Sequence, residues 1–261
     1  MSVLLEAKCV SKHFGGLKAV DQVDMVINKG DIFGIIGPNG AGKTTFFNLC
    51  SGIFPVTEGE IWLDGENITN LRPDIIAKKG MARTFQNIKL FNYMTVLENV
   101  KIGFHIHGKT RMWDSILHTS TYKRDEKLAE EKSMEILARV GLIEHKDTLA
   151  GNLAYGMQRR VEIARALALD PKILLLDEPA AGMNPNETMA VMEFIKKLNQ
   201  EGYTVAVIEH DMKFVMNTCN KVLVLNFGKK ICEGDPDYVK CNKEVNEAYF
   251  GKGIIAGGVT M

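Results

Sequence analysis

A glycine-rich segment directly after an apolar run is the feature that most restricts how this chain can fold. Residues 37–44 read Gly-Pro-Asn-Gly-Ala-Gly-Lys-Thr and fit the pattern GxxxxGK[ST]. The apolar run before them, residues 32–36, is typical of a strand buried on both faces. Glycine lets the backbone curl until successive N–H groups point at one anion, and the helix expected next directs its positive end at the same anion. This order of strand, loop and helix predicts an α/β chain with a phosphate-binding loop.

The side chains of this loop suit a nucleotide together with its metal. Lys43 places a cation on the terminal phosphates, and Thr44 offers a hydroxyl group to Mg²⁺. The loop residues expected to bind the nucleotide are Gly37, Pro38, Asn39, Gly40, Ala41, Gly42, Lys43, Thr44 and Thr45.

A second stretch, residues 103–110, matches the same pattern with the letters GFHIHGKT. Its middle residues are bulky or β-branched and resist the positive φ values that a phosphate loop requires. Thr95 and Glu98 form the pattern of a capping box, which predicts a helix rather than a strand before this match. We therefore predict that the match is accidental, and that His105 and His107 are solvated rather than metal ligands.

A second buried strand ends in two acidic residues. Residues 173–176 are apolar, and Asp177 and Glu178 follow directly. Unpaired buried charge is costly, so a magnesium ion is the expected compensation. The pattern predicts that Asp177 holds Mg²⁺ through water and that Glu178 polarises an attacking water molecule as general base.

Composition limits the remaining possibilities. The 261 residues are enough for one large α/β domain without disulfide bonds. The 32 basic and 32 acidic residues cancel, which gives no indication of a nucleic-acid-binding surface. The five cysteines are scattered without a CxxC pair, which suits a reducing cytosol. Neither a signal peptide nor a stretch of the ~20 apolar residues of a membrane span is recognisable, so work at a membrane requires docking onto another protein.

Apolar periodicity and turn residues predict alternating strands and helices at both ends of the chain, with a mainly helical insert between them. Expected strands cover residues 3–7, 23–27, 31–37, 173–176, 204–208 and 222–225, with hairpins around 58–66 and 227–228. Expected helices cover residues 44–51, 74–79, 123–140, 155–169, 187–201 and 212–219, and one more begins at residue 95. This pattern predicts an α/β P-loop NTPase core with a mostly parallel sheet, an antiparallel β edge subdomain and a helical subdomain. We assign residues 1–261 to a single domain, with the helical subdomain inserted at about 88–160.

Further segments resemble the motifs of ABC ATPases and occur in the order of that family. Residues 152–167, NLAYGMQRRVEIARAL, look like the ABC signature and the helix after it. Gln86 looks like the Q-loop glutamine, His210 like the switch histidine, and Phe14 like the aromatic residue that stacks on adenine. Residues 181–185 occupy the place of the D-loop. The resemblance covers nearly the whole chain and implies the ABC ATPase fold.

The resemblance also implies a mechanism in which the chain hydrolyses ATP with Mg²⁺ as one of a pair of ATPase subunits. ATP would lie between the phosphate loop of one subunit and the signature residues Ala154, Tyr155 and Gly156 of the other. Gln86 would reach the metal and pass motion to membrane permease subunits, and His210 would contact the γ-phosphate. The second subunit is another copy of this chain or a sister ATPase.

Within the family, the sequences of these motifs are most similar to those of the ATPases of branched-chain amino-acid importers. The segments that carry this similarity include ARTFQNIKLFNYMTVLENV, DEPAAGMNP and VIEHDMKFVM. They imply a peripheral subunit at the cytoplasmic face of the cell membrane, with a solute-binding protein as an indirect partner. The alternatives are an ATPase of a lipopolysaccharide-type exporter, a soluble ABC ATPase acting on DNA or ribosomes, and a nucleotide-binding switch without turnover.

The motifs depart from the family pattern at four positions. Ala154 lacks the serine hydroxyl expected toward the partner's γ-phosphate, Tyr155 adds bulk in place of a glycine, and Met157 replaces a glutamine. Asn184 replaces the usual D-loop aspartate. These departures bear on how strongly this signature supports hydrolysis in the opposite site.

Overall fold

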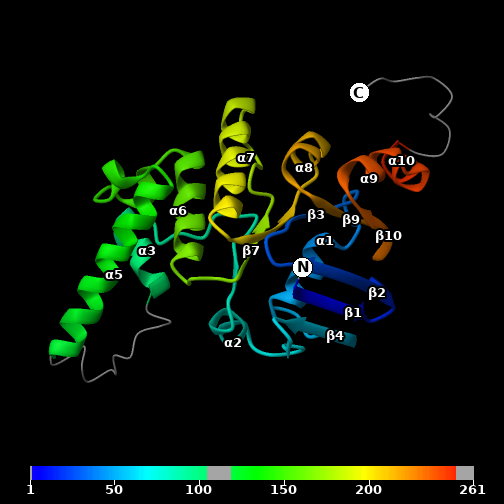
Figure 1. The fold of residues 1–261 in the computed structure, drawn as a ribbon, viewed down its shortest axis with the longest axis horizontal. Coiled ribbons are helices and arrows are strands. Elements are labelled where there is room, and N and C mark those ends of the chain that lie inside the picture. The colour runs from blue at the N-terminus through cyan, green and yellow to red at the C-terminus, as the bar shows by residue number, and fades with distance from the viewer. Residues whose placement is uncertain (1, 105–118, 251–261) are drawn as a thin grey trace. The chain divides into compact units, whose positions relative to one another are not determined.

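The computed structural model describes residues 2–104 and 119–250 of the chain (Figure 1). The chain forms two compact units. Unit 1 comprises residues 1–76 and 175–261, and unit 2 comprises residues 77–174. The assignment of one domain with a helical subdomain at about 88–160 stays a prediction.

The elements alternate along the chain much as the periodicity predicts. Those that lie in unit 1 or continue into it are β1 (Val3–Phe14), β2 (Leu17–Asn28), β3 (Ile32–Ile36), α1 (Lys43–Cys50), β4 (Glu58–Leu63), β5 (Glu66–Asn67), α2 (Pro73–Lys78), β7 (Ile173–Asp177), α7 (Pro185–Gln200), β8 (Thr204–Ile208), α8 (Met212–Thr218), β9 (Lys221–Asn226), β10 (Lys229–Gly234), α9 (Pro236–Cys241) and α10 (Lys243–Phe250). Those of unit 2 are β6 (Met81–Arg83), α3 (Val96–Phe104), α5 (Ser120–Arg139), η2 (Ile143–His145), η3 (Ala150–Asn152) and α6 (Tyr155–Leu167).

The core of unit 1 is a sheet with the strand order β10-β9-β3-β8-β7. β3 pairs in parallel with β8 and with β9, and every residue of β3, β7 and β8 is buried. Strands covered on both faces are expected to be almost entirely apolar, as these are. α7 packs against β8, α8 against β3 and α9 against β9, and Figure 1 shows these helices in a row along the sheet. The expected mostly parallel α/β core is therefore confirmed.

The antiparallel sheet of unit 1 has the order β2-β1-β4-β5. The strand expected at residues 3–7 is longer than predicted, because β1 continues to Phe14 before the chain turns back into β2. The pairing of β1 with β2 has register shifts between Ala7 and Val10 and between Val10 and Lys12. Bulges of this kind interrupt the alternation of apolar and polar residues. The periodicity of the sequence therefore did not predict the second half of the strand.

Two polar residues in that second half are buried and hydrogen-bonded. The Gln22 N–H donates to the Ser11 hydroxyl at 3.0 Å, and the Lys12 ammonium donates to Pro55 O at 2.8 Å. These contacts satisfy both polar side chains inside the sheet.

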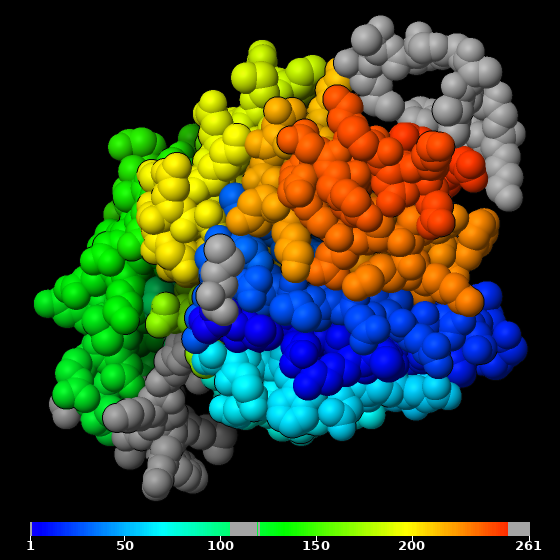
Figure 2. Space-filling view, turned by 45° about the vertical axis from the view of Figure 1, so that its right-hand side comes forward, coloured from blue at the N-terminus to red at the C-terminus, as the bar shows by residue number. Residues whose placement is uncertain are grey.

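The C-terminal part of unit 1 lies beside its N-terminal hairpin. The hairpin expected at residues 227–228 joins β9 to β10, and the Lys230 ammonium donates to Asp24 O at 3.0 Å. Figure 2 shows this C-terminal segment in orange next to β1 and β2 in blue. α9 and α10 then follow as two short helices that the sequence did not predict.

In unit 2, α3 packs against both α5 and α6. A Cβ atom at Gly103 would lie 2.6 Å from the Ala168 Cβ atom and 2.6 Å from Arg165 O, so glycine permits this close approach. The helix expected before the second glycine–lysine match is α3, and it extends into the first two residues of the match, Gly103 and Phe104. The rest of that match, with His105 and His107, lies outside the described residues.

The predicted capping box at the start of α3 is present. The Thr95 N–H donates to Glu98 Oε2 at 2.7 Å, and the Glu98 N–H donates to the Thr95 hydroxyl at 3.1 Å. These two contacts satisfy backbone donors that the first helical turn leaves without partners.

Replacing Thr95 by alanine removes the hydroxyl acceptor of this box and is expected to cost about 1 kcal/mol of stability. For a protein of this size, that loss lowers the melting temperature by about 2–4 °C in scanning calorimetry. Thr95→Ser, which keeps the hydroxyl, serves as the matched control and melts close to the wild type. Equal melting temperatures for Thr95→Ala and the wild type would contradict the cap.

Candidate functional site

The carboxyl ends of three neighbouring strands meet at one edge of unit 1. β3 leads into the glycine-rich loop, β7 ends at Asp177, and β8 is followed by Glu209. The Glu178 N–H donates to Ile208 O at 2.9 Å, and the Glu209 N–H donates to Ile35 O at 3.4 Å, so the three strand ends lie next to one another. Open α/β sheets bind their ligands outside the carboxyl ends of the strands.

The glycine-rich loop, residues 37–42, has a backbone that other residues would strain. φ is 80° at Gly40 and 100° at Gly42, in the left-handed region that favours glycine. A Cβ atom at Gly42 would lie 2.5 Å from Ala19 O, whereas nothing lies within 4 Å of one at Gly40. Gly42 is therefore needed for packing against β2, whereas Gly40 borders open space.

Lys43 is buried behind this loop, with a relative exposure of 7%. Its ammonium group donates to Gly37 O at 2.7 Å and to Pro38 O at 3.1 Å. Burial lowers the pKa of the Lys43 ammonium, and the charges of Glu178 and Asp177 oppose this shift. Phosphate oxygens are stronger acceptors than peptide carbonyls, so a bound nucleotide would compete for the same cation.

Thr44 and Asp177 supply the oxygen atoms that Mg²⁺ prefers. Thr44 is exposed on the first turn of α1, Thr45 beside it is half-buried, and Asp177 is 1% exposed at the end of β7. Within residues 2–104 and 119–250, no group of three or more His, Cys, Asp or Glu side chains could hold a metal ion. An ion here would complete its shell with phosphate oxygens and water, which is how Mg²⁺ binds in nucleotide sites.

Glu178 has a backbone conformation that is unusual for glutamate. Its φ is 47°, in the left-handed region. The backbone is held there because the Glu178 N–H donates to Ile208 O at 2.9 Å and the Ala181 N–H donates to Glu178 O at 3.1 Å. Strain of this kind persists only where surrounding contacts hold it, and it clusters at functional sites.

His210 lies at the same edge, in the loop after β8. Its side chain is 60% exposed, whereas the neighbouring Glu209 side chain is 1% exposed. The His210 Nδ1 atom is 3.7 Å from Glu209 Oε2, and the Ala180 N–H donates to Glu209 Oε1 at 3.1 Å. The sequence analysis missed Glu209, although an acidic residue directly after a buried strand and before a candidate histidine was a usable signal.

Phe14 ends β1 and is 44% exposed. Its ring packs edge-on against Phe54, with centroids 5.5 Å apart and an interplanar angle of 82°. The Lys12 ammonium is 5.1 Å from the centroid of the Phe14 ring. The role of Phe14 with adenine stays a prediction.

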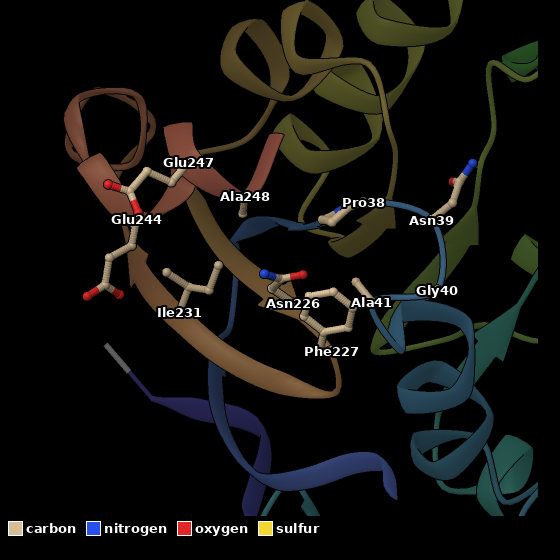
Figure 3. A pocket seen from close by; sticks show the side chains of 10 residues that line it. All are labelled: Pro38, Asn39, Gly40, Ala41, Asn226, Phe227, Ile231, Glu244, Glu247 and Ala248. Atoms are coloured by element: carbon tan, nitrogen blue, oxygen red, sulfur yellow. The ribbon is translucent and has the colours of Figure 1, made fainter. Parts of the chain in front are cut away.

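A cavity of ≈ 470 Å³ in unit 1 adjoins the phosphate loop without including Lys43 or Asp177. It is lined by Pro38, Asn39, Gly40, Ala41, Asn226, Phe227, Ile231, Glu244, Glu247 and Ala248. Figure 3 shows the loop residues on one side and the two glutamates on the other. Two carboxylates repel a polyanion, so this cavity does not suit the phosphates of a nucleotide.

Gln86 lies in unit 2, in a loop that α6 holds by its backbone. The Arg159 guanidinium donates to Phe85 O at 2.5 Å and to Gln86 O at 2.7 Å, and it pairs with Glu162 at 2.8 Å. The Phe85 N–H donates to Glu162 Oε1 at 3.3 Å. Arg159 and Glu162 are 0% and 2% exposed, and the sequence analysis missed both. Their spacing of three on one helix was the available signal, but it also fits an exposed pair.

The candidate signature residues form the start of α6 in unit 2. Ala154 is the N-cap of α6 and provides no side-chain hydrogen bond, whereas a serine could. Tyr155 is 46% exposed, and Gly156 is half-buried. The Gln158 side chain donates to Leu153 O at 3.0 Å. The structure thus groups the loop, Asp177, Glu178, His210 and Phe14 in unit 1, and Gln86 and the signature in unit 2.

The sequence matches the family model described as "ABC transporter" over residues 20–181. A curated relative, the high-affinity branched-chain amino acid transport ATP-binding protein BraF of Pseudomonas aeruginosa, is 44% identical over 250 residues. That match covers 95% of this chain and 98% of BraF.

Solved structures agree with the sequence match. The crystal structure of an ATP-binding cassette of an ABC transporter in its ADP conformation superposes with a TM-score of 0.84 at 34% identity, covering 97% of this chain and 100% of the other. A dimeric ATP-binding cassette in a post-hydrolysis state with ADP and Pi gives a TM-score of 0.74 at 28% identity, covering 89% and 99%.

Lys43→Ala is expected to weaken nucleotide binding, because it removes the cation that the loop holds for phosphate. A charged hydrogen bond of about 3 kcal/mol corresponds to roughly a hundredfold in Kd. Titration with a fluorescent ATP analogue measures the loss. Lys196→Ala, which alters an exposed lysine on α7, is the control and should bind as the wild type does. Unchanged affinity of Lys43→Ala would refute the assigned loop.

Proposed function

This chain belongs to the ABC transporter family, and we propose that it is the ATP-hydrolysing subunit that powers an importer of branched-chain amino acids. The observation that carries the proposal is the 44% identity to BraF over 95% of the chain. The geometry of unit 1 supports the ATPase part, because a phosphate loop and two carboxylates lie at the same edge of the sheet.

Each residue of the site has its own role in ATP binding and hydrolysis. The backbone N–H groups of the phosphate loop and the Lys43 ammonium bind the phosphates of ATP. Thr44 and Asp177 would hold Mg²⁺, which would neutralise the charge that develops on the transferred phosphoryl group. The contact of Gln86 with the metal stays an expectation from the family resemblance. Glu178 takes the proton of the attacking water molecule, and His210 contacts the γ-phosphate.

A second ATPase subunit, either another copy or a sister chain, completes each nucleotide site. The resemblance to ABC ATPases implies that the signature of one subunit faces the phosphate loop of the other. The similar ATP-binding cassette that was solved as a dimer supports such a pair. Ala154 has no hydroxyl group to offer the partner's ATP, so the backbone at the start of α6 makes this contact. Tyr155 is exposed in the single chain and is available to the partner.

The membrane partner is a permease on which the chain docks. No helix in the described ranges, 2–104 and 119–250, is long and apolar enough to cross a membrane. Unit 2 exposes Phe91, Tyr93 and Leu149 by 51%, 95% and 40%, and the Gly151 N–H donates to Asn92 O at 3.1 Å, which brings their two segments together. Exposed apolar clusters mark interaction surfaces, which supports docking of a permease here. The chain then acts at the cytoplasmic face, and the solute-binding protein contacts the permease.

The proposal predicts that cells whose own copy of this chain is deleted lose uptake of labelled leucine, isoleucine and valine. The wild-type chain restores uptake, and Lys43→Ala does not restore it at equal expression, because transport needs bound ATP. Uptake of labelled glucose is the control and stays unchanged. Normal leucine uptake in the deleted cells, with loss of a different solute or of an exported lipid, would contradict the assigned substrate class.

A further inference from the structure

Glu209 is a buried carboxylate at the candidate catalytic edge. It directly follows β8 and is 1% exposed. Its Oε1 atom accepts from the Ala180 N–H at 3.1 Å, and its Oε2 atom accepts from the His210 N–H at 3.3 Å. Among the residues that the structure describes, His210 is the only potentially cationic group within ion-pair distance of it. Burying a charged group costs free energy, so a buried carboxylate such as Glu209 is a candidate for a functional role.

The contacts of Glu209 join two loops at the candidate catalytic edge. Ala180 lies two residues after Glu178, in the loop between β7 and α7, and His210 lies in the loop between β8 and α8. One carboxylate therefore bridges the loop that carries the proposed general base and the loop that carries the histidine proposed to contact the γ-phosphate. If either loop moved alone, it would break a hydrogen bond to Glu209 and leave a buried group unsatisfied.

The Glu209 carboxylate also lies beside the imidazole ring of His210. The His210 Nδ1 atom is 3.7 Å from Glu209 Oε2, the same oxygen that accepts from the His210 backbone N–H. A buried carboxylate on one side of a functional histidine restricts the orientation of its ring.

We propose that Glu209 is a positioning residue for ATP hydrolysis: it orients His210 and ties it to the loop after Glu178. The inference rests on the proposed ATPase function and assigns a role that no motif of the family resemblance assigns. Glu209 acts through His210 and through the Ala180 N–H, and it does not itself touch the nucleotide.

The electrostatic surroundings agree with such a role. Burial raises the pKa of the Glu209 carboxyl, the contacts with the Ala180 N–H and His210 lower it, and the charge of Glu178 raises it. Cys219 also faces Glu209 and is neutral, because burial and the Glu209 charge raise the pKa of its thiol to about 12. Taken together, these effects raise the pKa of the Glu209 carboxyl, with burial as the main cause.

The test is a double-mutant cycle on kcat with Glu209→Gln and His210→Ala. Glutamine keeps the shape and one acceptor for the Ala180 N–H, but its amide group then faces the donors of His210. We expect Glu209→Gln to lower kcat by about ten- to a hundredfold, with KM for ATP changed by less than about threefold. In the His210→Ala background, the same change should have almost no further effect on residual single-turnover hydrolysis.

Two controls separate positioning from folding. Glu209→Gln loses one of the two loop contacts, so its melting temperature is measured first, and kcat is compared at a temperature where both proteins are fully folded. Glu193→Gln, an exposed change on α7, should leave kcat and KM unaltered. The inference would be overturned if the fold reductions in kcat of the two single variants multiplied in the double mutant. It would also be overturned if Glu209→Gln left kcat unchanged. A His210→Ala protein with full turnover would instead overturn the assigned role of His210 in the proposed function, and this inference with it.

Discussion

The buried ammonium group of Lys43 is the charge on which the arrangement of unit 1 depends. It donates to two carbonyl groups of the phosphate loop, while Asp177 and Glu178 counteract the fall in its pKa that burial causes. A buried cation needs carboxylates nearby, and carboxylates at the ends of buried strands need a cation. Each part of the site therefore stabilises the other before a nucleotide binds. The left-handed backbone of Glu178 is a local cost of bringing the second carboxylate to this edge.

In unit 2, a single helix holds the loops that matter for function. α6 begins at the candidate signature, and its buried Arg159 binds the carbonyl groups of Phe85 and Gln86. Six residues further along α6, Arg165 donates to Lys89 O at 2.5 Å. A shift of α6 would therefore carry the Gln86 loop with it. In the proposed function, the signature meets the partner's ATP, so α6 would link that contact to the position of the Gln86 loop.

Short, strongly apolar strands and the loops after them were predictable from the sequence, because burial on both faces leaves a continuous apolar run. β3, β7 and β8 with their loops follow this rule, and so does the capping box at Thr95. The second half of β1 was not predictable, since bulges break its alternation and long-range contacts bury Ser11 and Lys12. Glu209 and the pair of Arg159 and Glu162 were missed for a related reason: each of them contacts a backbone group that is distant in the sequence, and a sequence pattern does not reveal such contacts.

The most direct test of the account is the rate of phosphate release by Glu178→Gln at saturating Mg-ATP, measured beside its affinity for ATP. The account assigns Glu178 the proton of the attacking water, and glutamine keeps the shape of the side chain without its basicity. It predicts a rate reduced by about a hundredfold or more, with Kd for ATP within about threefold of the wild type. Turnover close to that of the wild type would contradict the claim that the carboxyl ends of β3, β7 and β8 form the hydrolytic site.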